Sequence, residues 1–253
     1  IDMNRLSAIV TVSDDGGSTG RLIEEFDVLL PGDIRKLLVA LSEADDLVSS
    51  LFEYRFSSNG DLSGHTVGNL LLIALTELNQ NSFPKAIQEA SKLLAVRGQI
   101  IPASLQPTVL CAELSDGEIV RGESLIPERK NREPIRRIFL EPRGNDSVAE
   151  ITAHRGAVTA IRQADAIIIG PGSLYTSIMP NLAYSEIAEV IRTSTAVKIY
   201  ICNVMSQPGE TDNYTVTQHV QAIIDQSEIG IDYVLVNDGL ASPQILKNYA
   251  QQE

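Results

Sequence analysis

The chain has 253 residues, of which 43% are hydrophobic, so it is long and apolar enough to form one large globular domain. Its net charge of −13, from 20 lysines and arginines against 33 aspartates and glutamates, opposes binding to nucleic acid or to an anionic membrane surface. Two cysteines without CxxC spacing exclude a disulfide framework and a structural zinc site, and they fit a reducing cytoplasm.

The chain begins at Ile1, without an initiator methionine or a signal peptide, so we expect a cytoplasmic protein that is part of a longer gene product. Its longest apolar run is far shorter than the roughly 18 residues of a membrane span, so no membrane insertion is expected. One local run is basic and is interpreted as a solvated loop and strand edge: Arg129, Lys130, Arg132, Arg136 and Arg137.

Four short apolar runs predict strands buried on both faces, at residues 6–12, 166–169, 197–202 and 233–236. Apolar residues spaced by three and four predict helices between them, at residues 31–43, 66–78, 83–96, 182–192, 215–226 and 243–251. The second of these carries a wide apolar stripe typical of a buried helix: Val67, Leu70, Leu71, Ala74, Leu75 and Leu78. Strands that alternate with helices predict an α/β fold with a parallel sheet covered on both faces.

One stretch interrupts this alternation. Residues 108–114 and 118–126 flank Asp116-Gly117, whose glycine supplies the positive φ of a tight turn, so a β-hairpin is predicted. Residues 136–140 add a candidate third strand. We therefore expect one domain over residues 1–253 with a β insertion at about 107–142.

Three glycine-bearing loops follow predicted strands. Because the carboxyl ends of parallel strands lie at one edge of a sheet, these loops are expected to form one ligand site. The first loop contains Asp14, Asp15, Gly16, Gly17 and Ser18. Its glycines expose amides to phosphate oxygens, and its carboxylates suit a sugar hydroxyl or a magnesium ion. A turn with a helix cap is the alternative interpretation.

The second loop contains Gly170, Pro171, Gly172 and Ser173, and the serine is expected to cap a helix whose amino end attracts anions. An ordinary strand-to-helix turn explains it equally well. The third loop offers hydrogen-bonding groups for a base or a sugar: Asn203, Gln207, Glu210 and Thr211.

Two further segments open helices. His65 is expected at the amino end of the helix over 66–78, where the dipole lowers the imidazole pKa, and Asn69 lies one turn along the same face. A capping and packing role is the alternative. Arg35 and Lys36 lie early in the helix over 31–43, where cations are unfavourable, which indicates either an anionic partner or simple solvent exposure. His154 and His219 have no ligand-like companions in the sequence.

Five segments of the chain, taken together, carry a family resemblance: VTVSDDGGSTGRL, LPGDIRKLLVAL, GHTVGNLLL, ADAIIIGPGSLYTSIMPNL and YICNVMSQPGETDNYT. They resemble the bacterial gluconeogenesis-factor family, a branch of the superfamily that contains 2-phospho-L-lactate transferase. The resemblance implies a Rossmann-like, doubly wound and mostly parallel α/β fold. It implies a nucleotide ligand, with UDP-sugars favoured over NAD or GDP, and a regulatory role in cell-wall synthesis and cell shape on gluconeogenic carbon sources. Homo-oligomers and cell-wall regulatory proteins are candidate partners.

The resemblance also places ligand-facing positions on this chain. They are Asp14, Asp15, Gly16, Gly17, Ser18, His65, Asn69, Gly170, Pro171, Gly172, Ser173, Asn203, Glu210 and, near the carboxyl end, Tyr249. Family members normally open with another strand and a GGGTG loop, which this sequence does not supply.

Three functions remain open at this point. The first is a non-catalytic, regulatory nucleotide or sugar-nucleotide binder. The second is a transferase with a nucleotide-diphosphate donor and a magnesium ion at Asp14 or Asp15. The third is a pure interaction scaffold. The absence of HExxH and GxxxxGK[ST] motifs argues against zinc proteases and P-loop ATPases.

Overall fold

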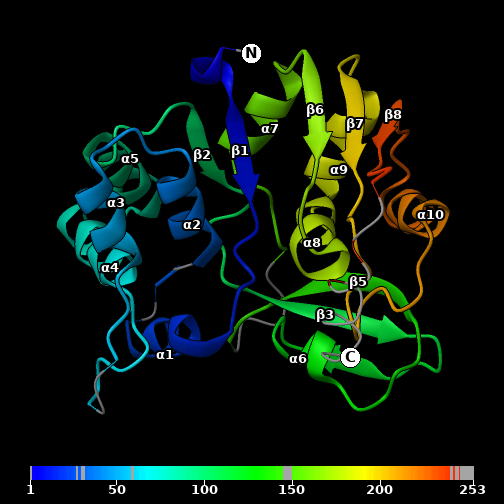
Figure 1. Ribbon diagram of the computed structural model, residues 1–253, viewed down its shortest axis with the longest axis horizontal. Coiled ribbons are helices and arrows are strands. Elements are labelled where there is room, and N and C mark those ends of the chain that lie inside the picture. Colours follow the sequence, from blue (N-terminus) through cyan, green and yellow to red (C-terminus); the bar gives the residue numbers. More distant parts are fainter. Residues whose placement is uncertain are drawn as a thin grey trace.

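A computed structural model describes residues 2–26, 28–29, 32–57, 60–144, 150–239, 242 and 245 (Figure 1). The first half contains η1 (Met3–Arg5), β1 (Ser7–Val10), α1 (Gly17–Phe26), α2 (Gly32–Ala40), α3 (Asp46–Glu53), α4 (Val67–Leu78), α5 (Phe83–Leu93), β2 (Gln99–Pro102), β3 (Thr108–Leu114), β4 (Ile119–Arg121) and α6 (Leu125–Glu128). The second half contains β5 (Ile135–Pro142), α7 (Arg155–Arg162), β6 (Ala166–Ile169), the π-helix η2 (Leu174–Ile178), α8 (Met179–Leu182), α9 (Ser185–Thr193), β7 (Val197–Ile201), α10 (Val216–Ser227) and β8 (Tyr233–Leu235).

The parallel strands divide between two sheets. In the described part of the chain, β1 pairs with β2, and β6, β7 and β8 form a second sheet in that order. Both sheets are parallel, with Ile9 beside Ile101 in the first and Ile168 beside Ile199 in the second. In Figure 1, β1, β6 and β7 all end toward the lower half of the view, where β3 and β5 lie. The expected α/β class with parallel strands is therefore confirmed.

The β insertion forms a separate antiparallel sheet in the order β4-β3-β5. Leu110 pairs with Leu140 on one side of β3, and Cys111 pairs with Arg121 on the other. The tight turn forms as predicted, with Gly117 at φ +91°. The second strand of the hairpin is shorter than expected, because Gly122 at φ +109° ends β4 and the chain then enters α6.

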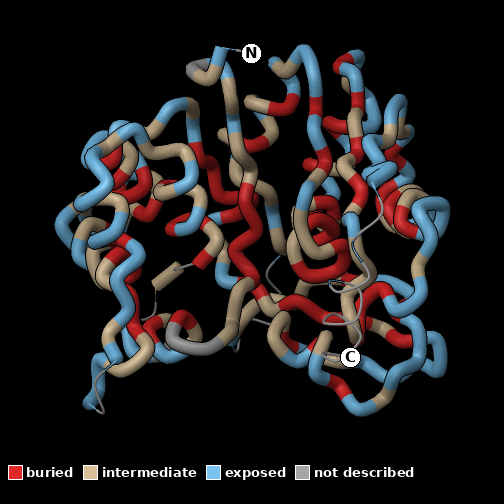
Figure 2. Tube along the Cα trace, in the orientation of Figure 1, coloured by how far each residue is buried: buried red, intermediate tan, exposed pale blue. Residues whose placement is uncertain are grey.

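Two hydrophobic cores hold these layers together. The first packs α1 to α5 against β1 and β2, around fully buried side chains such as Ile34, Leu38 and Leu72. The second joins β3 and β5 to the β6-β7-β8 sheet and its helices, around Leu110, Tyr200 and Ile223. Figure 2 shows that burial continues past β1 into residues 11–13, so the loop that follows the strand starts inside the protein.

The apolar stripe of α4 is not its most buried face. Leu78 is 80% exposed and Ala74 is exposed, whereas the side that carries Asn69, Leu72 and Thr76 is buried. Because this helix is apolar around most of its circumference, spacing could not identify the buried face. The structure therefore buries a face with two polar residues.

Several elements had no clear signal in the sequence, among them β2, α1, α3 and α7. The expected helix over 243–251 falls almost entirely outside the described residues. None of the described helices is long and apolar enough to cross a membrane.

Candidate functional site

The loop after β1 is fastened by its two adjacent carboxylates. Asp14 accepts hydrogen bonds from the amides of Gly16 and Gly32, at 3.0 and 2.9 Å. Asp15 accepts from the amides of Glu123 and Ser124, at 3.1 and 3.0 Å. Asp14 therefore holds the start of α2, and Asp15 holds the segment between β4 and α6. Burial is the main cause that raises the pKa of Asp14, although the two amide hydrogen bonds oppose it.

The amino-terminal turns of three helices meet around Thr19. Thr19 lies in the first turn of α1, after Gly17 and Ser18, and it is 7% exposed. The Asn69 amide in the first turn of α4 donates to the Thr19 hydroxyl at 3.4 Å. A Cβ atom at Gly32, the first residue of α2, would lie 2.8 Å from an Asp14 carboxylate oxygen and 3.4 Å from the Thr19 hydroxyl, so only glycine allows this approach. Positive helix ends thus converge at this point.

His65 and Asn69 are both buried here and both keep an unpaired polar atom. Thr66, between them in sequence, caps α4 by accepting from the Asn69 amide nitrogen at 3.3 Å. The His65 Nδ1 and the Asn69 Oδ1 have no partner, although the residues are only 5% and 3% exposed. Burial first, and then the charge of Arg21, lowers the pKa of His65. The pKa moves in the expected direction, but burial rather than the helix dipole is its main cause.

The loops after β6 and β7 contact each other directly. The Asn203 amide donates to the Gly172 carbonyl at 3.0 Å, and the Gln207 amide donates to the Ser173 hydroxyl at 2.8 Å. The side-chain oxygens of Asn203 and Gln207 are buried and have no hydrogen-bond partner among the described residues. Ser173 precedes η2 as expected, but its side chain makes no capping hydrogen bond. The predicted serine cap is wrong, because Gln207 engages that hydroxyl instead.

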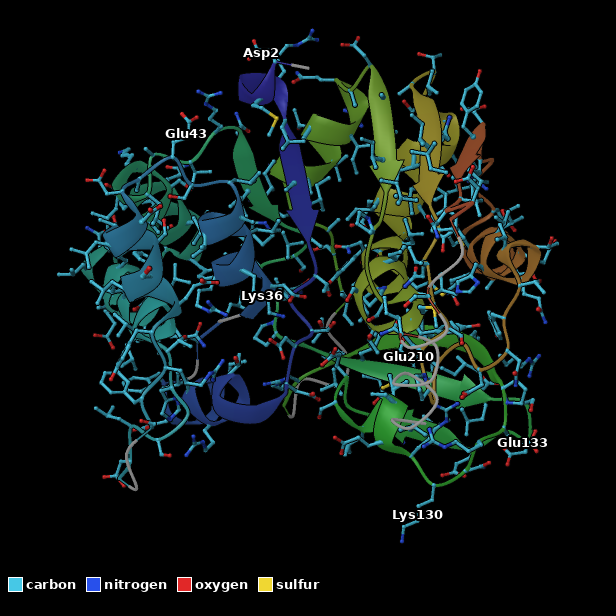
Figure 3. The ribbon with its side chains drawn as sticks, in the orientation of Figure 1. Asp2, Lys36, Glu43, Lys130, Glu133 and Glu210 are labelled. Atoms are coloured by element: carbon cyan, nitrogen blue, oxygen red, sulfur yellow. The ribbon has the colours of Figure 1, made fainter. Side chains whose placement is uncertain are left out.

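Glu210 occupies the helix end that was expected to attract an external anion. Its carboxylate accepts from the Tyr175 amide at 3.3 Å and from the Thr176 hydroxyl at 3.1 Å. Glu210 is 6% exposed, and burial raises its pKa. Figure 3 labels it between the lower end of β7 and β5. The chain therefore supplies its own anion to the amino end of η2.

Glu123, which follows β4, lies near acidic residues of the first and the third loop, and no pattern in the sequence indicated it. Burial first, and then the neighbouring charges of Asp14, Asp15, Asp33 and Glu210, raise the pKa of Glu123 to about 7. Asp14 and Asp15 belong to the first loop, Asp33 to α2 and Glu210 to the third loop, so Glu123 lies within electrostatic range of the first and the third loop. A carboxyl group with a pKa near neutrality is a candidate proton acceptor.

A cavity of about 260 Å³ opens at the carboxyl ends of β7 and β8. Its lining includes Asn203, Ser206, Tyr214 and His219. The His219 Nδ1 lies 2.9 Å from the Thr215 carbonyl, and its buried Nε2 has no partner. His219 and Asn203 both line this cavity, which the sequence could not reveal because one lies on α10 and the other follows β7.

Three expectations need separate mention. Tyr249 lies outside the described residues. Arg129 is not solvated: it is 8% exposed and donates to the carbonyls of Ile126, Gly209 and Glu133, which ties the β insertion to the third loop. Among the described residues, no group of three or more His, Cys, Asp or Glu side chains is arranged to hold a metal ion. Asp14 and Asp15 accept from different partners, and a magnesium ion at either of them stays a prediction.

Comparison with known proteins places this geometry in a family. The family model described as 2-phospho-L-lactate transferase CofD matches residues 2–253. The chain belongs to this family. Gly170 and Pro171, in the loop after β6, are joined by a cis peptide bond, and the loop leads through Gly172 and Ser173 into η2.

Relatives and solved structures agree with this family. A protein of Halalkalibacterium halodurans described as a gluconeogenesis factor is 49% identical over 98% of this chain and 74% of its own length. A Bacillus subtilis protein of the same description is 48% identical over 98% of this chain and 75% of its own length. The crystal structure of a UPF0052 family member from Bacillus halodurans has a TM-score of 0.90 at 48% identity, and the match covers 99% of this chain and 79% of that one.

Proposed function

We propose that the protein is a regulatory, non-catalytic binder of a nucleotide, with a UDP-sugar as the favoured ligand, and that one ring of the ligand occupies the cavity at the ends of β7 and β8. Its volume of about 260 Å³ is close to the lower limit of roughly 300 Å³ for small-molecule sites, which suits one base or one sugar ring. The role proposed for the whole protein is control of cell-wall synthesis and cell shape on gluconeogenic carbon sources.

The observation that carries the proposal is that two residues lining this cavity each have a hydrogen-bond acceptor without a donor. The Thr215 carbonyl can only accept, so the His219 Nδ1 carries the hydrogen, and the Nε2 of that tautomer is an acceptor. The Asn203 amide nitrogen is engaged by Gly172, which leaves its Oδ1 as a second acceptor. Both atoms are enclosed by the protein, so a ligand that offers N–H or O–H groups would satisfy them only after the lining of the cavity shifts, and the cost of buried acceptors without donors favours that shift.

Calorimetry with UDP-glucose, GDP and NAD tests this proposal, and His219→Asn sharpens it. The asparagine amide can still donate to the Thr215 carbonyl in place of Nδ1, but the Nε2 acceptor is gone. We expect about tenfold weaker binding, as for the loss of one hydrogen bond of about 1.4 kcal/mol. His154→Asn is the matched control, because His154 also buries an unpaired Nδ1 but does not line the cavity.

Two results would contradict the proposal. The first is the absence of both heat and thermal shift with any of the three nucleotides. The second is an equal loss of affinity in both histidine variants, which would show that the cavity is not the binding site.

A transferase is the second candidate function, and Glu123 is the observation that favours it. The matched family is described by a transferase, and a carboxyl group with a pKa of about 7 could accept a proton from an attacking hydroxyl. A panel of nucleotide-diphosphate donors and hydroxyl acceptors, assayed with and without magnesium, tests this. Glu123→Gln should remove turnover while leaving nucleotide affinity intact. If the wild-type protein forms no product with any pair, the protein is not a transferase of this type.

A further inference from the structure

Two cations lie near the start of α2, and one is exposed while the other is buried. The Lys36 side chain is 67% exposed and forms an ion pair with Asp33 at 2.8 Å. Figure 3 labels it beside α2. Arg35 is only 7% exposed, and it makes no hydrogen bond and no ion pair with any part of the described chain. Lys36 thus needs no further partner, whereas Arg35 is a buried charge without one.

Arg35 is held by its packing against α4. A Cβ atom at Gly68 would lie 2.9 Å from the Arg35 Cδ and 3.0 Å from its Cγ, so the aliphatic stem crosses the first turn of α4 where that turn has no side chain. The nitrogens of Arg35 are not among the fully enclosed polar atoms that lack partners. The guanidinium group therefore keeps a narrow access to solvent while its stem is enclosed.

The surrounding charges do not compensate this guanidinium. Glu53 and Asp33 lie within electrostatic range, but Asp33 is paired with Lys36, and the like charge of Arg55 opposes both. Burial is the main cause that lowers the pKa of Arg35. Arg55 donates to the carbonyl of Gly64, and Arg21 donates to that of Ser63 at 2.5 Å. These two arginines have protein acceptors that Arg35 lacks.

We propose that Arg35 binds a phosphate group at the place where the amino-terminal turns of α2 and α4 meet. Its planar fork of donors matches two phosphate oxygens, and the adjacent helix ends add positive potential. A bound phosphate supplies the missing counter-charge, which explains why the chain keeps a costly buried cation there. The phosphate belongs either to a nucleotide or to a free anion. The nucleotide case rests on nucleotide binding as proposed above, but at a second position, because α2 and α4 lie on the opposite flank of the molecule from β7 and β8 (Figure 1); the free-anion case does not rest on it.

The test replaces Arg35 by methionine, which keeps an unbranched stem against Gly68 and removes the charge. Lys36→Met is the matched control, one residue along the same helix. Calorimetry uses pyrophosphate, UDP and uridine as probes. We expect Arg35→Met to bind pyrophosphate and UDP at least tenfold more weakly and uridine unchanged, and Lys36→Met to stay within twofold of the wild type.

Urea unfolding of the same variants separates a binding role from a structural one. Without ligand, Arg35→Met should unfold at an equal or higher urea concentration than the wild type, because it removes an unpaired buried charge. Pyrophosphate should raise the midpoint of the wild type and not that of Arg35→Met. Equal pyrophosphate and UDP affinity in the wild type and Arg35→Met would overturn the assignment alone. Pyrophosphate binding without UDP binding would support it and overturn the nucleotide proposal. Binding of neither probe to the wild-type protein would overturn both.

Discussion

Replacing Glu123 by glutamine tests the electrostatic picture of the site. Burial and the charges of Asp14, Asp15, Asp33 and Glu210 raise the pKa of Glu123 from an ordinary 4.5 to about 7. The folded state therefore binds more protons than the unfolded state between these values, so this group makes stability fall as the pH rises through that window. The stability is fully present below pH 4.5 and has been lost above pH 7.

The size of the effect follows from the same shift. One pKa unit corresponds to about 1.4 kcal/mol, so the upper limit is about 3 kcal/mol, and we expect about 1 to 2 kcal/mol because solvent partly reaches this half-buried side chain. Glutamine keeps the shape and the backbone amide that Asp15 accepts from. Glu123→Gln should therefore be more stable than the wild type at pH 8 and equal to it near pH 4.

Urea unfolding at pH 4, 6 and 8, followed by circular dichroism, measures this difference. Glu128→Gln is the control, because Glu128 lies on the same insertion but is exposed. A difference between Glu123→Gln and the wild type that stays constant with pH would refute the reasoning, because it would show that the four acidic neighbours do not repel the carboxylate of Glu123.

Three further predictions concern stability and reactivity. Glu210→Ala should lower the free energy of unfolding in urea by about 2 to 4 kcal/mol, because it leaves the buried Tyr175 amide and Thr176 hydroxyl without an acceptor. An unchanged free energy of unfolding would show that water replaces the carboxylate. Thr215→Ala should cost about 1 kcal/mol in the same assay, because it removes the capping box that joins Thr215 and Gln218 at the start of α10, and an unchanged midpoint would contradict this role. Cys111 is fully buried and burial raises its pKa to about 12, so a thiol reagent at pH 8 should label it only after unfolding, and fast labelling of the native protein would disprove this.

The sequence allowed a good prediction of the elements whose signal is local. The strand at 166–169 has the predicted bounds, and the Asp116-Gly117 turn forms between β3 and β4. The face of α4 could not be predicted, because tertiary packing selects among several apolar faces. The division of the parallel strands between two sheets was also hidden, since the pairing of strands distant in sequence is set by tertiary contacts.

The candidate site shows the same limit. The contact between the second and third loops agrees with the rule that parallel strands end at one edge, and His65 and Asn69 are brought together at α4. Glu123 and His219 were missed because their partners lie on other elements, and no spacing links them. Arg35 had a usable signal, a cation placed where a helix dipole disfavours it, but Lys36 had the same signal and is exposed, so the sequence could not distinguish the two.

The two carboxylates after β1 have a consequence for how the molecule tolerates change. Adjacent side chains on extended backbone point in opposite directions, and here one faces Gly32 and the other faces Glu123 and Ser124. A slip of this segment by a single residue would reverse both attachments at once. Insertions and deletions between residues 10 and 16 should therefore abolish function even where single substitutions are tolerated. A circularly permuted chain whose new ends lie in the β insertion would need Asp15 to bind the amides of Glu123 and Ser124 again in the same register.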